Sequence, residues 1–338
     1  MYDDMRIKID KPLGIFETGS RSNMEDCLYP AYGDGKDTDR LFMLCDGMGG
    51  HDNGEVASAT VCKTVADYIV SAGEELVTDE TIGAAIEAAV KELDAKDGGG
   101  MRKMGTTMTL TCFHRGGCLA AHIGDSRIYH IRPAERRIMY KSRDHSLVYD
   151  LYMAGEISRE EMSTYGKKNV ITRAMMPGLD ETPKADIVHI TDIREGDIFY
   201  MCSDGMLEQM DDDELVELLC CGMSLEEKRQ RLVELTKDNK DNHSAYIISI
   251  ADVIKEKGDE ALCGDEATSR SNAVYLEAKK EGVLDVKVVS TIGNEQEAKT
   301  VTRSEETAHN VIRRTLWMVL IVVMAVVFLV VVLVKLCL

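Results

Sequence analysis

Residues 1–251 alternate between short apolar runs and longer stretches in which apolar residues recur every three or four positions. Strands are predicted at the apolar or β-branched runs 41–45, 106–113, 118–123, 126–131, 197–202 and 245–250. Glycine-containing turns such as 114–117 separate several of them, which is typical of antiparallel hairpins. Helices are predicted at the periodic segments 54–71, 79–94, 212–221 and 224–237. Helices grouped around antiparallel hairpins indicate an α+β fold rather than a doubly wound parallel sheet.

Two of the predicted helices carry more specific signals. Five apolar residues of 54–71 are expected on one buried face: Val56, Val61, Val65, Tyr68 and Ile69. The acidic run 211–214 is expected to cap the first turn of the helix at 212–221, because carboxylates there accept hydrogen bonds from unpaired N–H groups.

The composition changes twice after the last predicted strand. Residues 252–314 are rich in charged and small polar residues and are predicted to form a linker, in which 284–289 alternates enough for one short docking strand. Residues 316–334 are 19 uncharged, mainly aliphatic positions. As a helix they would be about 28 Å long, close to the bilayer core of about 30 Å. A buried core helix is the alternative, but this run has no polar face, so 315–338 is predicted to be a single transmembrane helix with a short tail.

Charge and cysteine usage place the folded body in the cytosol. Arg313 and Arg314 precede the apolar run and only Lys335 follows it, which favours a cytoplasmic N-terminal side. The ten cysteines form no CxxC pair and several lie in apolar runs, as expected for free thiols in a reducing compartment. We therefore expect a single-pass membrane protein whose body, 1–251, faces the cytoplasm.

Overall composition limits the kinds of partner. With 44% apolar residues among 338, the chain can bury a sizeable core. Its formal net charge of −19 argues against a nucleic-acid partner, because phosphate backbones require clustered Lys and Arg.

Five short acidic motifs lie where predicted strands begin or end. They are Arg-Ser-Asn-Met-Glu-Asp at 21–26, Asp-Gly-Met-Gly-Gly at 46–50, Gly-Asp-Ser-Arg at 124–127, Ser-Asp-Gly at 203–205 and Asp-Asn at 241–242. A folded sheet can bring such positions together from distant parts of the chain. Oxygen ligands suit hard divalent cations, whereas softer metals favour Cys or His. The motifs therefore predict a Mg²⁺ or Mn²⁺ site.

Individual motifs add detail to this prediction. An isolated Asp-Gly pair usually marks a turn, but Asp46 ends a buried run, and Gly47 would let the backbone approach an ion and offer its carbonyl. Of the adjacent carboxylates Glu25 and Asp26, one could bind and the other support. Arg21 could hold a phosphate dianion through its guanidinium, with a salt bridge to Glu25 as the alternative.

Taken in order, the motifs resemble those of the metal-dependent protein serine/threonine phosphatases of type 2C, in their compact bacterial form. The matching strings are those at 21–26, 46–51, 104–107, 123–129, 144–146, 202–206 and 241–244, which together span nearly all of 1–251. The resemblance implies a four-layer α-β-β-α sandwich of two antiparallel sheets flanked by helices. It also implies that 1–251 is a catalytic domain and that 147–168 is a mobile flap beside the cleft.

The resemblance further implies roles for individual residues. Asp46, Asp204 and Asp241 would bind two Mn²⁺ or Mg²⁺ ions, and the Gly47 carbonyl with Glu25 or Asp26 would complete the centre. Two ions can activate a water for attack on phosphorus without an enzyme nucleophile.

Further roles follow for the remaining positions. Arg21 would hold the phosphate, and Asp125 would belong to a third, weaker metal position, where Glu208 stands in place of the usual Asp. Met48 stands where eukaryotic members carry a His, which leaves the general acid unassigned.

Two classes of function remain open at this point, and among enzymes a regulatory phosphatase for one dedicated partner, rather than for kinase targets generally, is a further alternative. The first is hydrolysis of phosphoserine and phosphothreonine in proteins by a monomeric catalytic domain at the membrane, with a membrane serine/threonine kinase and its substrates as candidate partners. The alternative is a non-catalytic phosphoprotein-binding module of the same fold. The intact residues Asp46, Asp204 and Asp241 favour the enzyme.

Overall fold

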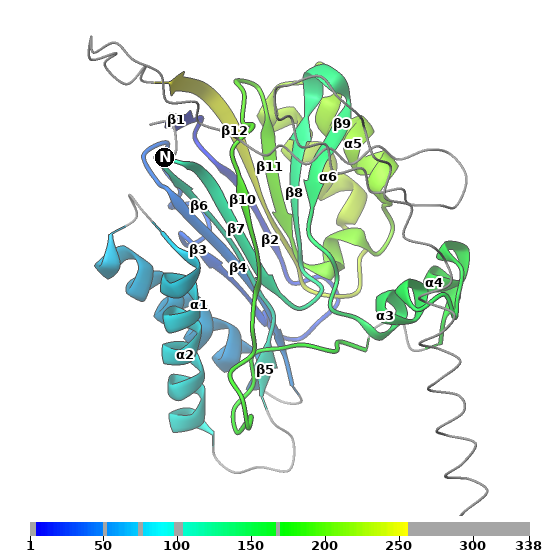
Figure 1. The fold of residues 1–338 in the computed structure, drawn as a ribbon. Helices are drawn as coiled ribbons and strands as arrows, with labels where there is room; N and C mark the ends of the chain where they lie inside the picture. The colour runs from blue at the N-terminus through cyan, green and yellow to red at the C-terminus, as the bar shows by residue number, and fades with distance from the viewer. Residues whose placement is uncertain (1–4, 50–52, 74–76, 98–103, 167–169, 256–338) are drawn as a thin grey trace, which may run out of the picture. The chain divides into compact units, whose positions relative to one another are not determined.

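The computed structural model describes residues 5–49, 53–73, 77–97, 104–166 and 170–255 (Figure 1). All of them belong to the compact unit Met1–Leu262, one of two into which the chain divides. No helix in these described ranges is both long and apolar enough to cross a bilayer. The predicted span at 316–334 and nearly all of the predicted linker lie outside the described residues, so both stay predictions.

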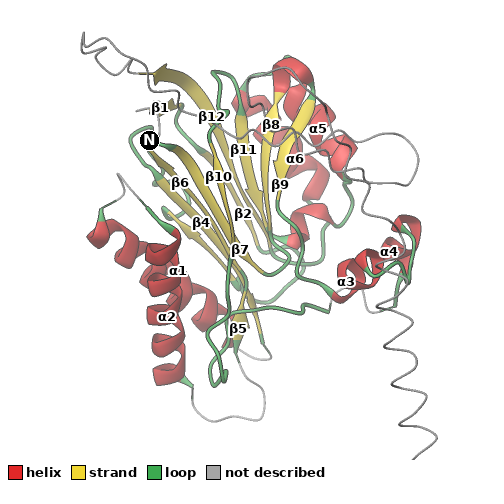
Figure 2. Cartoon of the chain, viewed as in Figure 1, coloured by secondary structure: helices red, strands yellow, loops and turns green. Residues whose placement is uncertain are grey.

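Two antiparallel sheets of six strands each form the centre of this unit (Figure 2). The first sheet has the order β1 (Met5–Ile9), β12 (His243–Lys255), β11 (Ile198–Cys202), β8 (Arg127–Arg132) and β9 (Arg137–Lys141), with β2 (Leu13–Glu17) also paired to β12. The second has the order β10 (Asp186–Ile190), β7 (Gly117–Ile123), β6 (Met108–His114), β4 (Leu41–Met48) and β3 (Asp26–Tyr29), with β5 (Gly105–Thr106) paired to β4.

Three hydrophobic clusters correspond to the three contacts between four layers. One joins the second sheet to α1 (Asn53–Ala72) and α2 (Asp79–Lys96). Another joins the first sheet to α5 (Asp212–Cys220) and α6 (Leu225–Thr236). The third lies between the sheets and holds the edge-to-face aromatic pairs of Phe42, Phe113, Phe199 and Tyr246. The predicted sandwich of two antiparallel sheets flanked by helices is therefore confirmed.

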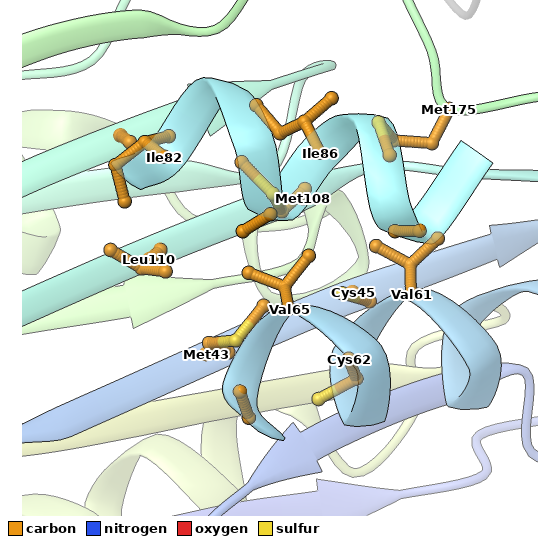
Figure 3. Packing of buried hydrophobic residues seen from close by; sticks show 14 of the residues in the cluster. Met43, Cys45, Val61, Cys62, Val65, Ile82, Ile86, Met108, Leu110 and Met175 are labelled. Carbon is orange, nitrogen blue, oxygen red and sulfur yellow. The ribbon is translucent and has the colours of Figure 1, made fainter. Parts of the chain in front are cut away.

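Strand β4 shows why its sequence is apolar without alternation. Met43 and Cys45 point into the cluster beneath α1 and α2 (Figure 3), whereas Phe42 and Leu44 belong to the cluster between the sheets. Both faces of the strand are buried, so both must be apolar. This places the end of β4, at Asp46–Met48, at the margin of two packed layers.

The helix predicted at 54–71 forms as α1, but its predicted face is wrong at two positions. Val61, Val65 and Ile69 are fully buried, whereas Val56 and Tyr68 are 39% and 38% exposed. Val56 lies about 140° around the helix from Val61, since each residue turns it by about 100°. Small residues, among them Ala57 and Ala66, fill the buried face instead.

Other element predictions are confirmed with changes at their ends. The run 106–113 is divided into β5 and β6, and Asp211 caps α5 through a hydrogen bond from the Glu214 N–H. Strand β12 continues to Lys255, past the predicted domain end at 251, because its last residues pair with β1. Elements without a sequence prediction are β1, β2, β3, β9, β10, α3 (Leu147–Met153), α4 (Arg159–Thr164), and the 3-10 turns η2 (Pro133–Glu135) and η3 (Asp204–Leu207).

Candidate metal centre

Four aspartates approach one another from four segments of the fold. Asp26 opens β3 and lies opposite Asp46 of β4 in the antiparallel register. Asp204 begins η3, two residues after β11, and Asp241 lies two residues before β12, the neighbour of β11. The site therefore joins ends of strands from both sheets, as the sequence predicted for these acids.

Two threonines fix the backbone of Asp46. Its N–H donates to Thr107 Oγ1 at 2.9 Å, and its carbonyl accepts from the Thr107 N–H and the Thr106 hydroxyl, each at 2.9 Å. These threonines end the string 104–107, whose role the motif alone did not reveal. Because the threonines hold both its N–H and its carbonyl, the backbone of Asp46 has a fixed position at the end of β4, and this backbone sets the direction of the carboxylate.

Gly47 lies where three backbone segments meet. Its N–H donates to the Glu25 carbonyl at 3.1 Å, and a Cβ on Gly47 would overlap the carbonyl oxygens of Gly54 and Glu25. A Cβ on Gly54 would in turn lie 2.9 Å from the carboxyl carbon of Glu25. Only glycine fits at position 47, and the Glu25 carboxylate is placed against the first turn of α1.

Arg21 and Asn242 hold the segment that carries Glu25 against the Asp241 loop. Arg21 Nη2 lies 2.6 Å from Asp241 Oδ2, so its ion pair is with Asp241 rather than with Glu25. The Asn242 side chain accepts from the Glu25 N–H at 2.8 Å and donates to the carbonyls of Thr18 and Asn23. No role was predicted for Asn242 from its motif, although its position directly after Asp241 was a signal that could have identified it.

Asp26 is the most enclosed of the predicted ligands. The Ser203 hydroxyl donates to its Oδ2 at 3.0 Å, while its Oδ1 is buried without a hydrogen-bond partner among the described residues. Burial, together with smaller contributions from the charges of Asp204 and Asp241, raises the pKa of Asp26 to about 7.

The neighbouring carboxylates show the same effect. Burial raises the pKa of Asp46 well above its ordinary value, and the charges of Asp26 and Asp204 add to the shift. Burial also raises the pKa of Asp204, with Asp241 as the next cause. Acids held so close together repel one another when ionised, and a bound cation removes that repulsion.

The two residues predicted for a third metal position differ in their surroundings. Asp125 follows β7 in a buried turn, with an Oδ1 that has no partner in the described structure. Burial and then the charge of Asp204 raise its pKa to about 7. Glu208 is exposed, and its two carboxylate oxygens accept hydrogen bonds from the N–H groups of Lys240 and Asp241, at 2.9 and 3.1 Å.

These residues fit hard divalent cations. The donor set consists of carboxylate oxygens and one backbone carbonyl, and Asp26 and Asp125 each have a buried oxygen without a protein partner. Mn²⁺ and Mg²⁺ prefer such oxygens to nitrogen or sulfur.

A second group of possible ligand atoms, all within 4.8 Å of one another, comprises His122, His145 and Asp186. The two imidazole rings lie parallel, 4.7 Å apart. His145 Nδ1 accepts from the Gly124 N–H, so in the neutral ring Nε2 carries the proton, 3.4 Å from Asp186 Oδ2. A protonated Nε2 cannot bind a metal, so these contacts indicate a structural role for His145.

Comparison with known proteins agrees with this geometry. The family model described as Protein phosphatase 2C matches residues 24–237. A putative protein phosphatase 2C-type from Streptococcus pyogenes is 30% identical over 237 residues, which cover 68% of this chain and 91% of that protein.

Solved structures show the same likeness. The PPM Ser-Thr phosphatase MsPP from Mycobacterium smegmatis, solved with cacodylate, has a TM-score of 0.60 at 26% identity and covers 72% of this chain and 99% of its own. The catalytic domain of the serine threonine protein phosphatase PstP, solved with two manganese ions, has a TM-score of 0.57 at 28% identity and covers 73% and 100%. With its matched sequence, its sandwich of two antiparallel sheets and its clustered aspartates, this chain belongs to the protein phosphatase 2C family of serine/threonine phosphatases.

Proposed function

We propose that this chain hydrolyses phosphoserine and phosphothreonine in proteins with two Mn²⁺ or Mg²⁺ ions, and that it does so at the cytoplasmic face of a membrane. The observation that carries the catalytic part is the convergence of Asp26, Asp46 and Asp204 with raised pKa values at one margin of the two sheets. A structural role would not require several acids to be withdrawn from solvent beside one another without a basic partner for each.

Each residue has a role in this proposal. Asp46, Asp204 and Asp241 hold the two ions, and the Gly47 carbonyl with Glu25 or Asp26 completes the centre. When bound, the ions activate a water for attack on phosphorus and neutralise charge on the transferred group. Asp125 would belong to a third and weaker position.

Arg21 is placed to bind the substrate phosphate. Its side chain is 52% exposed, so it can reach a ligand in solvent, while Asp241 holds one end of the guanidinium. Hydrogen bonding to Asp241 raises the pKa of Arg21 further, which keeps the cation charged. The remaining N–H groups can form the paired bonds that a phosphate accepts.

The membrane part of the proposal is supported by the sequence. The uncharged run 316–334, preceded by Arg313 and Arg314, would anchor the chain with residues 1–251 on the cytoplasmic side, and 252–314 would link the two. Substrates would then include phosphoproteins at the membrane, among them a transmembrane serine/threonine kinase and its targets.

The experiment that tests the catalytic proposal is hydrolysis of a phosphothreonine peptide with Mn²⁺, with Mg²⁺ and with excess chelator. Asp46→Asn, Asp204→Asn and Asp241→Asn should each reduce turnover by several orders of magnitude, with each tenfold loss equal to about 1.36 kcal/mol. Asp213→Asn, which removes the same charge from the exposed face of α5, serves as the matched control. Full activity in chelator would refute the mechanism, and peptide binding without turnover would favour the binding module.

A further inference from the structure

We propose that Glu208 is a positioning residue that sets the distance between Asp204 and Asp241, rather than a ligand of a third metal. This inference rests on the proposed two-metal function of those aspartates. It arises from the contacts of the Glu208 carboxylate, both oxygens of which are engaged by the backbone of the Asp241 loop.

The contact joins two segments that each carry a proposed ligand. Glu208 directly follows the turn η3, which begins at Asp204, so its carboxylate belongs to the Asp204 side of the site. Its Oε1 accepts from the N–H of Asp241 and its Oε2 from the N–H of Lys240, at 3.1 and 2.9 Å. A bidentate carboxylate on two consecutive amides fixes both the position and the direction of that peptide segment.

Neighbouring contacts strengthen the same connection. The Asn239 side chain donates to the Gly205 carbonyl at 2.6 Å and accepts from Gln209 Nε2 at 3.0 Å. A Cβ on Gly205 would overlap the Asn242 carbonyl oxygen, so the η3 turn and the loop approach very closely. Glu208 completes this set at the point nearest Asp241, whose own carboxylate has only Arg21 and the Asn242 N–H as hydrogen-bond partners among the described residues.

The two possible roles of Glu208, metal ligand and positioning residue, lead to opposite expectations for Glu208→Asp. Aspartate is one methylene shorter and cannot reach both amides, yet it keeps the negative charge. If Glu208 were a ligand whose length weakens a third site, Glu208→Asp would strengthen metal binding. If Glu208 positions the loop, the same substitution weakens binding at Asp241. Glu208→Gln is less informative because, after burial and the charge of Asp241, the charge of Glu208 also raises the pKa of Asp204.

The first measurement is titration calorimetry of the full chain with Mn²⁺. Glu208→Asp should bind Mn²⁺ about tenfold more weakly, which corresponds to about 1.4 kcal/mol, with an unchanged number of sites. Glu227→Asp is the matched control, because Glu227 is an acid that accepts the Ser224 N–H in the cap of α6 and is not a proposed ligand. Its Mn²⁺ affinity should equal that of the wild type.

The second measurement is amide hydrogen exchange in chelator, which needs neither metal nor activity. The amides of Lys240 and Asp241 should be protected in the wild type and should exchange several-fold faster in Glu208→Asp, while both proteins melt within a degree or two of the Glu227→Asp control. A merely structural role would lower the melting temperature without a selective loss of Mn²⁺ affinity.

Three results would overturn the proposal. The first is tighter Mn²⁺ binding or an additional site in Glu208→Asp, and the second is equal Mn²⁺ affinity in Glu208→Asp and the wild type. The third is a lack of protection of the amides of residues 240 and 241 in the metal-free wild type. Failure of the proposed function looks different. In that case the wild type and Asp46→Asn would bind Mn²⁺ with equal affinity, regardless of the amide hydrogen-exchange rates at residues 240 and 241.

Discussion

At the scale of single residues, the carboxylates of the metal centre have an unfavourable electrostatic free energy when they are ionised without a bound cation. Asp26 is buried, Asp46 and Asp204 are half-buried beside it, and desolvation with mutual repulsion raises the pKa of each. Ionising them costs free energy until a cation is bound, so metal binding should release protons.

This cost predicts the pH dependence of the metal-free protein. The pKa of Asp26 is about 7 in the folded chain and about 3.9 when unfolded. Its contribution to the free energy of unfolding is therefore complete below about pH 4 and is lost as the pH rises through about 7. In chelator, Asp26→Asn should gain stability over the wild type between pH 5 and pH 8, by on the order of a few kcal/mol. A difference in melting temperature between Asp26→Asn and the wild type that does not change with pH over this range would contradict the assigned burial of the charge.

Arg21 allows binding and chemistry to be separated. If it holds the phosphate equally in the ground and transition states, Arg21→Ala should raise KM more than it lowers kcat. Arg21→Lys should restore only part of the loss, because an ammonium cannot form the paired bonds of a guanidinium. Steady-state kinetics on a phosphopeptide measure both. Because Arg21 also contacts Asp241, Mn²⁺ affinity is the necessary control. Wild-type kinetics for both variants would show that Arg21 does not bind the phosphate and that its role is the structural ion pair with Asp241.

The acids could be found from the sequence because each stands beside a recognisable strand end or glycine. Their supports could not. Asn242 contacts Glu25 and Thr18, which are more than two hundred positions earlier, and Ser203 contacts Asp26. A hydroxyl or amide in a motif does not reveal which distant group it binds, because that depends on how the two sheets pack.

At the scale of elements, predictability followed the strength of the local pattern. The long helices α1 and α2 and the buried strands β4, β6 and β7 have extended apolar patterns and were predicted. Strand β3 has only four residues, too few to define a period, although β1 does alternate buried and exposed residues over five positions. The alternating pattern of β1 is therefore present in the sequence but short, and the burial of β1 depends on pairing with the end of β12.

The corrected face of α1 can be tested with two matched truncations. Val61 is fully buried against the second sheet (Figure 3). Val56, in contrast, is 39% exposed. Val61→Ala should lower the free energy of unfolding by about 2 kcal/mol, through lost burial and the cavity left behind. Val56→Ala should change it by less than about 0.5 kcal/mol. Urea denaturation of the metal-loaded proteins measures both, and equal losses would restore the face predicted from the sequence.

At the scale of the whole molecule, the catalytic unit ends later than the sequence suggested. Residues 252–255 of β12 pair with Met5–Lys8 of β1, and Lys8 forms an ion pair with Asp252 at 3.1 Å. Met5 and Ile7 are buried in the cluster between the sheets. A chain cut after residue 251 would lose four of the five residues that pair with β1, so its first strand would be poorly anchored.

Two truncated chains test this boundary. The chain ending at Leu262, the end of the compact unit, should melt at the temperature of the full chain's catalytic unit and hydrolyse a small aryl phosphate at the same rate. The chain ending at 251 should melt several degrees lower, while its metal ligands are all retained. Equal melting temperatures for the two would show that the β1 pairing contributes little.

The same truncation at Leu262 separates catalysis from location. Every proposed ligand precedes residue 242, and the apolar run begins only at Leu316. If that run spans a bilayer with Arg313 and Arg314 on the cytoplasmic side, the full chain should remain with membranes after a carbonate wash, and the shortened chain should not. Inside cells the shortened chain should act poorly on membrane-bound phosphoproteins, because it has lost the high effective concentration that a shared surface provides. Its activity on a small aryl phosphate in solution should be unchanged. A full chain that is extracted by carbonate, while both forms are equally active, would refute the tether and leave the metal centre intact.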